Sequence, residues 1–522
     1  MTPSARTPPP ELGTGEFDLL VIGGGITGAG IARDAALRGL TVALVEAGDF
    51  GSGTSSRSSR LIHGGLRYLE QRRFSLVAES LRERAILLRL APNLVRPIEF
   101  ILPFYRGDRV PGWKVRLGLA LYDVLAGRGN VRPHKGLGKR GVQEAEPQLR
   151  TRGLRGGARY LDAQCDDARL TVSVVRGAAS AGAKVANYRR VVSLLRDSDQ
   201  IRGARVQDTL RGGEVEVRAR LVVNATGPWT DELRRMEDPA AAPILRPTKG
   251  SHVQVPRARI GNRHAILFAS PIDRRAMFVL PWGDWTYIGT TDIDTTEAPD
   301  QVTPSDAEII YLLRSANALF PEARLSQDDI VASWAAVRPL LAEDPGTPAT
   351  RVSREHRILK GSGGMLTVAG GKLTTFRAMA EQVVDLAARE LGHAKSSKGG
   401  RSRTEPLPGG EGAAGLALRG PGAALGLPEA TVEYLRRHYG TETSLIYNFC
   451  REEPDLVKPI CRTHPSIGAQ VRFAVQREFA RTTDDVLDRR IRISLETTDG
   501  GASARSEVER LMARYVSRHE DD

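Results

Sequence analysis

The hydrophobic and polar pattern near the amino terminus predicts a strand, a helix and a second strand in direct succession. Residues 17–22 form a short, continuous apolar run, which is typical of a parallel strand buried on both faces. A glycine-rich turn follows, and residues 29–39 then carry apolar side chains at helical spacing and end on a glycine. A second apolar run, residues 41–45, ends on Glu46. This order is typical of the first βαβ unit of a dinucleotide-binding domain.

The turn between these elements has the glycine spacing that a dinucleotide pyrophosphate requires. Gly23 permits the tight turn, Gly25 lets the backbone approach the pyrophosphate, and Gly28 lets the helix pack closely on the strand. The N–H groups at the helix N-terminus favour phosphate there. Glu46 lies where an acid accepts the ribose hydroxyls, and no arginine follows it directly, which disfavours NADP. The glycine pattern alone leaves FAD and NAD open.

Two later segments favour FAD. Residues 219–227 form an apolar run that ends in a turn of small residues, and residues 368–375 form a turn that opens a helix running to about residue 391. Both are similar to the segments with which flavoproteins of the glutathione-reductase class return to the FAD. In those proteins the second turn places a helix N-terminus near the flavin pyrimidine, where its dipole stabilises negative charge on the reduced ring.

A polar loop after Glu46 carries the most specific resemblance. Residues 48–70 are rich in glycine and hydroxyl side chains, turn at Gly64 and Gly65, and lead into a helix, a composition suited to wrapping a cofactor. Their sequence resembles, almost letter for letter, that of the FAD-dependent glycerol-3-phosphate dehydrogenase family. Further matches follow in the family's order at residues 160–170, 224–229, 249–252, 288–292, 336–340, 370–375 and 406–410.

The resemblance covers residues 17 to about 410 and is less distinctive beyond them. It implies an α/β protein with a glutathione-reductase-type, Rossmann-like FAD-binding domain, an inserted antiparallel-sheet cap domain that binds the substrate, and a C-terminal helical domain. We expect a disordered tail at 1–16 and a flexible polar linker at 396–410. The expected domains are FAD-binding at 17–95, 150–245 and 352–395, cap at 96–149 and 246–351, and helical at 411–522.

The resemblance also implies that FAD is the cofactor and that sn-glycerol 3-phosphate is oxidised at C2 to dihydroxyacetone phosphate. Arginine forks bind phosphate oxygens in bidentate fashion, and Arg354, helped by Arg67, is the expected phosphate anchor. Arg338 and Lys372 are expected near the flavin and the reacting carbon. A cation there stabilises the alkoxide that develops during the reaction.

The remaining expected site residues concern the general base, substrate orientation and FAD. His252 is the expected base, because imidazole titrates near working pH, although a carboxylate or a neutral Lys372 stays open for this role. Tyr68 is expected to orient the substrate, and His63 to shape the loop or face the flavin. The cofactor-binding residues that the resemblance implies are Gly23, Gly25, Gly28, Glu46, Thr54, Ser55, Ser59, Leu61, His63, Gly64, Ala225, Gly227, Gly371, Leu373 and Thr374.

Residues 113–125 predict a helix with large apolar side chains and Lys and Arg at its flanks. This pattern is typical of a helix that lies in a membrane interface, and also of an amphipathic helix packed on its own domain. The family passes electrons to membrane quinone, or in oxidase relatives to oxygen, and no motif distinguishes the two acceptors. We expect a quinone-linked cytoplasmic enzyme, peripheral on the inner face of the cytoplasmic membrane.

Composition adds limits to this interpretation. The net charge of +13, from 75 Lys and Arg against 62 Asp and Glu, suits anionic partners such as phosphorylated substrates, anionic lipid or nucleic acid, and it also serves solubility alone. The three cysteines lack metal-type spacing, which predicts neither a disulfide framework nor a metal site. Residues 1–16 lack the apolar run of a signal peptide, and no apolar stretch of about 18 residues predicts a membrane span.

Three other functions are compatible with an FAD-binding chain of this kind. An amine or amino-acid oxidase of the same flavoprotein group binds a carboxylate and needs fewer cations than a dianionic phosphate does. An FAD-dependent tRNA-modifying transferase would suit the charge, but no basic patch interleaved with aromatic residues indicates nucleic acid. A non-catalytic flavin-binding module would not need the substrate-type residues. The sequence leaves open the electron acceptor, the oligomeric state (a homodimer is one option), and the role of residues 411–522.

Overall fold

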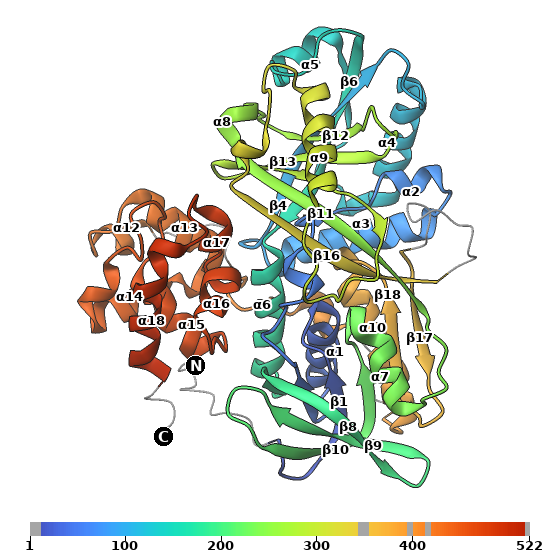
Figure 1. Cartoon of the computed structure of the whole chain (residues 1–522), viewed down its shortest axis with the longest axis vertical. Helices are drawn as coiled ribbons and strands as arrows, with labels where there is room; N and C mark the ends of the chain where they lie inside the picture. Colours follow the sequence, from blue (N-terminus) through green and yellow to red (C-terminus); the bar gives the residue numbers. More distant parts are fainter. Residues whose placement is uncertain (1–11, 343–353, 394–399, 413–418, 517–522) are drawn as a thin grey trace.

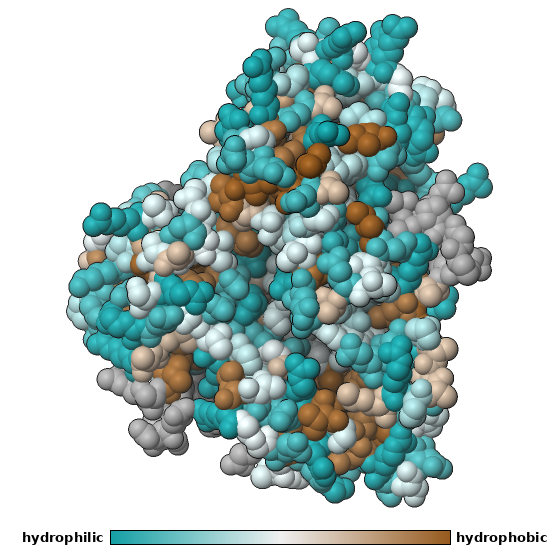
Figure 2. Space-filling view, viewed as in Figure 1, coloured by the Kyte–Doolittle hydropathy of each residue, from teal (hydrophilic) through white to brown (hydrophobic). Residues whose placement is uncertain are grey.

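The computed structural model describes residues 12–342, 354–393, 400–412 and 419–516. Two β-sheets lie one above the other along the long axis of the molecule, and a bundle of helices lies beside them (Figure 1). Hydrophilic side chains cover most of the face seen in Figure 2. Among the described residues, no helix has both the length and the apolar composition that a bilayer crossing requires.

The first sheet contains the predicted βαβ unit. Its parallel strands run in the order β18–β10–β1–β2–β7, with β17 antiparallel at one edge and the β8–β9 hairpin joined to β10. The bounds of its strands are β1 (Glu16–Ile22), β2 (Val42–Val45), β7 (Lys184–Ala186), β8 (Arg189–Asp197), β9 (Gln200–Asp208), β10 (Glu214–Asn224), β17 (His356–Lys360) and β18 (Leu366–Gly370).

Helices cover the first sheet and explain its apolar strands. α1 (Ile26–Leu37) contacts both α6 (Asp167–Ser180) and α10 (Phe376–Glu390), and its alanines, among them Ala29, Ala32 and Ala35, are fully buried. Small side chains let α1 approach both helices and the sheet closely. The Rossmann-like arrangement expected from the sequence is confirmed, and it sets the glycine turn at the carboxyl end of β1.

The second sheet contains ten strands and is antiparallel except where β12 pairs with β4. Its main order is β15–β11–β14–β13–β12–β4–β6–β3, with β16 paired to β11 and β5 to β6. The bounds are β3 (Leu61–Ile62), β4 (Val95–Tyr105), β5 (Lys135–Gly138), β6 (Leu154–Cys165), β11 (Leu245–Pro256), β12 (Ala265–Ala269), β13 (Ala276–Trp282), β14 (Trp285–Gly289), β15 (Ile293–Asp294) and β16 (Ala332–Leu341).

The position of β6 in the fold is not the one that the expected domain boundaries suggest. It falls within residues 150–245, which we expected in the FAD-binding domain, yet it pairs with β3, β4 and β5 of the second sheet. The β4–β6 ladder runs from Val95 opposite Cys165 to Tyr105 opposite Leu154. Such strand pairing is non-local, so the apolar pattern of β6 alone did not reveal its sheet.

The helices between the strands mostly cover the second sheet or the junction between the sheets. α3 packs against α4, and α9 packs against β11 and β14. The predicted helix at 113–125 is found as α4. Their bounds are α2 (Arg67–Glu70), α3 (Phe74–Leu90), α4 (Gly112–Ala126), α5 (Lys139–Ala145), α7 (Thr230–Glu237), α8 (Arg257–Ile260) and α9 (Asp306–Leu319).

The carboxyl-terminal helices form a bundle with a core of its own, as expected. Tyr439, Phe473 and Leu511 are buried in this core, and α15 packs against both α14 and α18. The bundle lies beside α6 (Figure 1). Its helices are α12 (Arg419–Ala423), α13 (Glu429–Tyr439), α14 (Thr443–Glu452), α15 (Gly468–Arg477), α16 (Thr483–Asp485), α17 (Ile493–Glu496) and α18 (Ala502–Val516).

Two segments expected to be flexible are partly ordered. Most of the tail expected at 1–16 lies outside the described residues, but Leu12 is buried and β1 begins at Glu16. In the expected linker, residues 396–399 also lie outside the described part. The rest forms α11 (Arg401–Thr404) and buries Leu407, because this apolar side chain joins the core around α1.

Candidate functional site

The site is a cavity where the two sheets meet, with an empty volume of about 1460 Å³ counting its open mouth. The loop after β2, strands β11 and β16, and the turn after β18 line it. The expected site residues that line it are Thr54, Ser55, Ser59, Leu61, His63, Arg67, Tyr68, His252, Arg338, Arg354, Gly371, Lys372, Leu373 and Thr374. The expected residues outside this lining are Gly23, Gly25, Gly28, Glu46, Gly64, Ala225 and Gly227.

The glycine turn between β1 and α1 is too tightly packed for side chains. A Cβ on Gly28 would lie 1.9 Å from the carbonyl oxygen of Gly23, and a Cβ on Gly23 would lie 2.6 Å from that of Ala225. Gly23 also has a φ of 109°, in the region that favours glycine. The backbone amide of Ala225 donates to the carbonyl of Ile22 at 2.9 Å, which brings the end of β10 beside this turn.

The residues at this turn fit an adenine dinucleotide. Gly25 is the N-cap of α1 and has no side chain to cap the helix, so backbone N–H groups at this end face the place where a pyrophosphate would bind. Oγ of Ser55 accepts a hydrogen bond from the backbone N of Ile26 at 2.9 Å, which brings the hydroxyl-rich loop over the helix N-terminus. Glu46 accepts from the N–H groups of Gly24 and Gly48 at 2.6 and 2.9 Å and retains lone pairs for a ribose hydroxyl.

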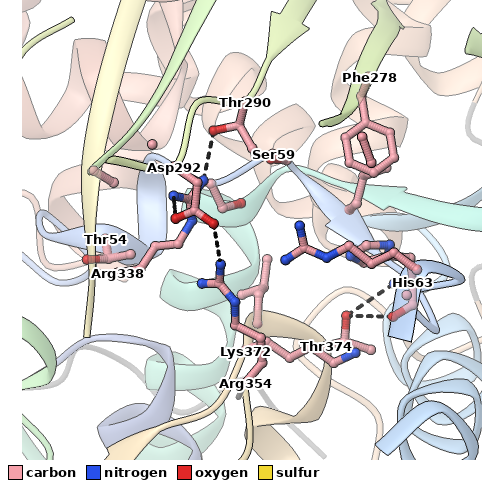
Figure 3. A pocket seen from close by; sticks show the side chains of 18 of the residues that line it. Thr54, Ser59, His63, Phe278, Thr290, Asp292, Arg338, Arg354, Lys372 and Thr374 are labelled. Carbon is pink, nitrogen blue, oxygen red and sulfur yellow. Dashed lines mark hydrogen bonds and ion pairs between the residues drawn. The ribbon is translucent and has the colours of Figure 1, made fainter. Parts of the chain in front are cut away.

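Two segments separated by 311 residues meet at the other end of the loop. The backbone N of His63 donates to Oγ1 of Thr374 at 3.1 Å, and this hydroxyl donates to the carbonyl of His63 at 3.3 Å (Figure 3). Nζ of Lys372 lies 3.5 Å from the carbonyl oxygen of Gly64. Burial, with help from Lys372 and Arg67, lowers the pKa of His63 to about 3, so its ring is neutral. The two turns are thus joined by hydrogen bonds, and the neutral ring of His63 suits contact with an uncharged flavin ring.

A carboxylate lies between two of the expected arginines. Nη1 of Arg338 and Nη2 of Arg354 donate to opposite oxygens of Asp292 at 3.1 and 3.0 Å, and Nη2 of Arg338 donates to Oγ1 of Thr290 at 2.8 Å (Figure 3). Burial raises the pKa of Asp292, but Arg338, Arg354 and Arg67 outweigh burial and hold it below its usual value. Asp292 is therefore ionised and offsets part of the local positive charge.

Arg67, Tyr68 and Lys372 form a second cluster in the cavity. Nη2 of Arg67 donates to the Tyr68 hydroxyl at 3.3 Å, and Nζ of Lys372 lies 5.2 Å from the centre of the Tyr68 ring. Burial lowers the pKa of Lys372 to about 8, although Tyr68 and Asp162 oppose this shift. For Tyr68 burial raises the pKa, but Arg67, Arg354 and Lys372 prevail and lower it to about 8. Both groups therefore change charge close to neutral pH.

His252 is buried at the wall of the cavity on β11. Its Nε2 lies 2.9 Å from Oγ of Ser59, and its ring stacks on Trp334 with a centroid distance of 5.1 Å. Within the described residues its Nδ1 has no hydrogen-bond partner. Burial, Arg338 and Arg60 lower the pKa of His252 to about 3, so the ring is neutral and its nitrogen lone pair can accept a proton.

Two glycines on neighbouring strands make room for the catalytic candidates. A Cβ on Gly289 of β14 would lie 2.1 Å from Cδ2 of His252, and a Cβ on Gly250 of β11 would lie 2.0 Å from Nη2 of Arg338. Both glycines fall in segments on which the family resemblance rests. The absence of a side chain at these two positions therefore leaves room for His252 and Arg338 at the cavity wall.

Two groups of residues at this site were not predicted from the sequence. Asp292 lies in the matched segment 288–292, but only the fold shows that it reaches Arg338 and Arg354. Tyr122 and Asp162 hold the Gly64 turn from behind, because the backbone N of Gly64 donates to the Tyr122 hydroxyl at 2.9 Å and this hydroxyl donates to Asp162 at 2.8 Å. No periodic signal marks such long-range contacts.

The comparisons with known proteins agree with this geometry. A sequence model of the family described as FAD dependent oxidoreductase matches residues 18–386. A second one, described as the C-terminal domain of alpha-glycerophosphate oxidase, matches residues 401–522. Together these two matches take in most of both sheets and the whole helical bundle.

Similar proteins extend over almost the full chain. An aerobic glycerol-3-phosphate dehydrogenase of Staphylococcus haemolyticus is 37% identical, over 91% of this chain and 86% of its own length. Glycerol-3-phosphate dehydrogenase 2 of Mycobacterium tuberculosis is 39% identical, over 96% and 85%. The solved structure of a glycerol-3-phosphate dehydrogenase from Bacillus halodurans complexed with FAD is 31% identical and aligns over 98% of this chain and 94% of its own, with a TM-score of 0.79.

Proposed function

This chain belongs to the FAD-dependent glycerol-3-phosphate dehydrogenase family, and from that premise we propose that it oxidises the C2 hydroxyl of sn-glycerol 3-phosphate and passes the electrons to a membrane quinone. The observation that carries the proposal is the convergence of four cations in one cavity beside the FAD turns, which are Arg67, Arg338, Arg354 and Lys372. A dianionic phosphate needs such a concentration of positive charge, whereas a carboxylate substrate needs less.

The roles within the cavity follow from position and charge. Arg354 and Arg67 bind the phosphate, since a planar guanidinium offers paired donors to phosphate oxygens. Arg338 and Lys372 stabilise the negative charge that develops on the C2 oxygen as it loses its proton. Tyr68 donates a hydrogen bond that orients the substrate.

His252 takes the proton of the C2 hydroxyl in this proposal. Its neutral ring lies beside Ser59 at the cavity wall, and burial and the charge of Arg338 lower its pKa; the incoming dianion raises this pKa because it offsets the charge of Arg338. When bound, FAD supplies the acceptor for the hydride that leaves C2. Replacing His252 with glutamine preserves the hydrogen bond to Ser59 but removes the basic nitrogen. If that variant kept near-normal turnover, His252 would not be the base.

The quinone and membrane part of the proposal rests on α4. Its inner face buries Leu119 and Tyr122, while Trp113, Leu117 and Val124 on its outer face are 64%, 65% and 75% exposed. A stripe of large apolar side chains flanked by basic residues suits insertion into a lipid interface. This supports a protein that is peripheral on the inner face of the cytoplasmic membrane, where it can reach quinone.

A second candidate is the oxidase, with oxygen as the acceptor in place of quinone. The family description matched by residues 401–522 names an alpha-glycerophosphate oxidase, which favours this alternative. The two are separated by comparing the rates of quinone reduction and hydrogen peroxide formation with the same enzyme preparation. Dominant peroxide formation would replace the quinone-linked function by the oxidase.

The substrate is tested by anaerobic bleaching of the bound flavin. We expect glycerol 3-phosphate to bleach it, and expect glycerol and sarcosine, which lack the phosphate, to leave it oxidised. Glycerol tests the need for the phosphate, and sarcosine tests the amine-oxidase alternative. Bleaching by sarcosine alone would contradict the proposed function.

A further inference from the structure

The hydroxyl-rich loop, residues 49–58, contacts the C-terminal helical bundle as well as the glycine turn between β1 and α1. On its inner side, Gly51 N donates to the carbonyl of Gly24 at 3.1 Å, and Ser55 accepts from Ile26 N at 2.9 Å. The ring of Phe50 lies so close to Gly24 that a Cβ there would be 2.5 Å from it. Any movement of this loop would therefore disturb the turn that faces the pyrophosphate.

On its outer side, Asp49 is held by two arginines of the bundle. Nη1 and Nη2 of Arg490 donate to its two carboxylate oxygens at 2.7 and 2.8 Å, and Nε of Arg489 also donates to it. Nδ2 of Asn187 adds a hydrogen bond at 3.0 Å. Nε of Arg490 donates to the carbonyl of Glu478 at 2.9 Å, which fixes the guanidinium to the bundle. Arg490 and Asp49 are both buried, so water does not screen the pair.

Arg492 of the bundle contacts the same loop a few residues further along the chain. Both terminal nitrogens of its guanidinium donate to the carbonyl of Ser56 at 3.3 Å, and Nη2 donates to Asp167 at 3.2 Å. Asp167 in turn accepts from the backbone N and the hydroxyl of Ser58 at 2.8 and 2.7 Å. The bundle thus holds both ends of the segment that carries Thr54 and Ser55.

We propose that Arg490 and Arg492 are positioning residues, through which the C-terminal bundle fixes residues 49–58 in the conformation that binds FAD. Buried ion pairs are costly to desolvate, and an apolar contact would attach one domain to another equally well. What a bidentate pair adds is a defined position for Asp49 and, through Phe50, for the glycine turn. This inference rests on the FAD site and is independent of which substrate the enzyme oxidises.

Another ion pair between the bundle and the rest of the protein provides a matched control. Arg176 on α6 donates to both carboxylate oxygens of Glu442 at 2.6 Å. This pair is also bidentate and poorly exposed, and the hydrogen bonds of Arg176 to Glu442 do not involve residues 49–58. Breaking it loosens the bundle without touching the FAD loop. If replacing Arg490 lowers FAD affinity and replacing Arg176 does not, the effect is therefore transmitted through residues 49–58.

The test is FAD affinity in the full chain. FAD is titrated into flavin-depleted Arg490→Met and Arg176→Met, and binding is followed by flavin fluorescence. We expect the Kd of Arg490→Met to rise about tenfold or more, because a charged hydrogen-bonded pair is lost. Arg176→Met should bind FAD like the wild type. Arg490→Lys, which keeps the charge and loses the fork, should lie between the two.

Thermal unfolding of each flavin-depleted variant separates positioning from a general loss of stability. If Arg490→Met does not fold, Arg490→Lys and Arg492→Lys carry the same comparison against Arg176→Lys. An equal rise in Kd for the Arg490 and Arg176 variants, or no rise for Arg490, would overturn the proposal. A rise confined to the Arg490 and Arg492 variants would support it, whatever the substrate test shows.

Discussion

The carboxylate of Asp292 reduces the repulsion between the cationic side chains of the cavity before a substrate binds. Arg67, Arg338, Arg354 and Lys372 repel each other in a partly buried space, and Asp292 supplies the only carboxylate among the described residues that line the cavity. The pKa of Arg338 shows both influences: burial lowers it to about 10 with help from Arg354 and Arg67, while Asp292 opposes that shift. A carboxylate in this position keeps the arginines charged and spaced for phosphate.

Replacing Asp292 with asparagine should therefore impair catalysis. An uncharged amide does not offset the arginines, and its NH₂ group replaces one of the two oxygens that accept from Arg338 and Arg354. A lost hydrogen bond to a charged group costs about 1.5–3 kcal/mol. We expect kcat/KM for glycerol 3-phosphate to fall about 10- to 100-fold. Asp294→Asn is the control, since Asp294 pairs with Arg246 on the exposed edge and should change kcat/KM by less than about threefold. Equal values for the two variants would contradict this role.

The charge of Lys372 should appear in the pH dependence. With a pKa of about 8, Lys372 is a cation below pH 8 and becomes neutral above it, so its stabilisation of the negative charge on the C2 oxygen weakens as pH rises. We expect kcat/KM, which reports the free enzyme, to fall as pH increases through about 8. In Lys372→Arg this fall should move to higher pH, because arginine keeps its proton.

Tyr68 is the second group that titrates in this range, and a variant distinguishes it. Because ionised Tyr68 raises the pKa of Lys372, Tyr68→Phe should keep the alkaline fall and move it to lower pH. A fall that vanished in Tyr68→Phe and persisted unchanged in Lys372→Arg would assign the titration to the tyrosine.

At the scale of elements, α4 has two apolar faces, and only one is used inside the molecule. Trp113, Leu117 and Leu121 repeat every four residues along the exposed side. Burying such side chains contributes about 1.5–3 kcal/mol each. We expect Trp113→Ser combined with Leu117→Ser to reduce binding to anionic vesicles about tenfold or more in a sedimentation assay.

Leu210 offers the matched control for this surface. It is half exposed in the turn before β10, far along the chain from α4, so Leu210→Ser should sediment with vesicles like the wild type. High salt should weaken the binding of the wild type, since basic residues flank the helix. Unchanged vesicle binding of the α4 variant would remove the membrane role of this helix.

The same scale shows which elements the sequence could predict. Local signals in the sequence, namely the spacing of apolar residues and glycines at the ends of elements, predict β1, α1, β2 and α4. β6 falls in a range expected in the FAD-binding domain, whereas it pairs with β4 of the second sheet, and its partner residues lie 49 to 70 positions away along the chain. Asp292 and Arg490 went unnoticed for a similar reason: a single charged residue has no periodicity, and its partner is known only after folding.

At the scale of the whole molecule, the FAD region is where the parts of the protein meet. The first sheet contributes the glycine turn, the second sheet contributes His252 and Arg338, and the helical bundle holds Asp49. The turn after β18 closes the other side through Thr374 and His63. FAD should therefore stabilise contacts between these parts more than it stabilises the interior of any one of them.

Hydrogen exchange can test this coupling by comparing flavin-depleted and FAD-saturated protein. FAD at about 100 times its Kd adds about 2.7 kcal/mol to the free energy of unfolding. Without FAD, we expect faster exchange at residues 48–64 and 366–376, because their contacts lie around the cofactor region. α15 and α18 lie in the separate core of the bundle and should exchange as before. An equal loss of protection in these helices and in the loop would mean that FAD stabilises the whole fold at once. A loss confined to the loop would show that the loop connects the bundle with the cofactor site.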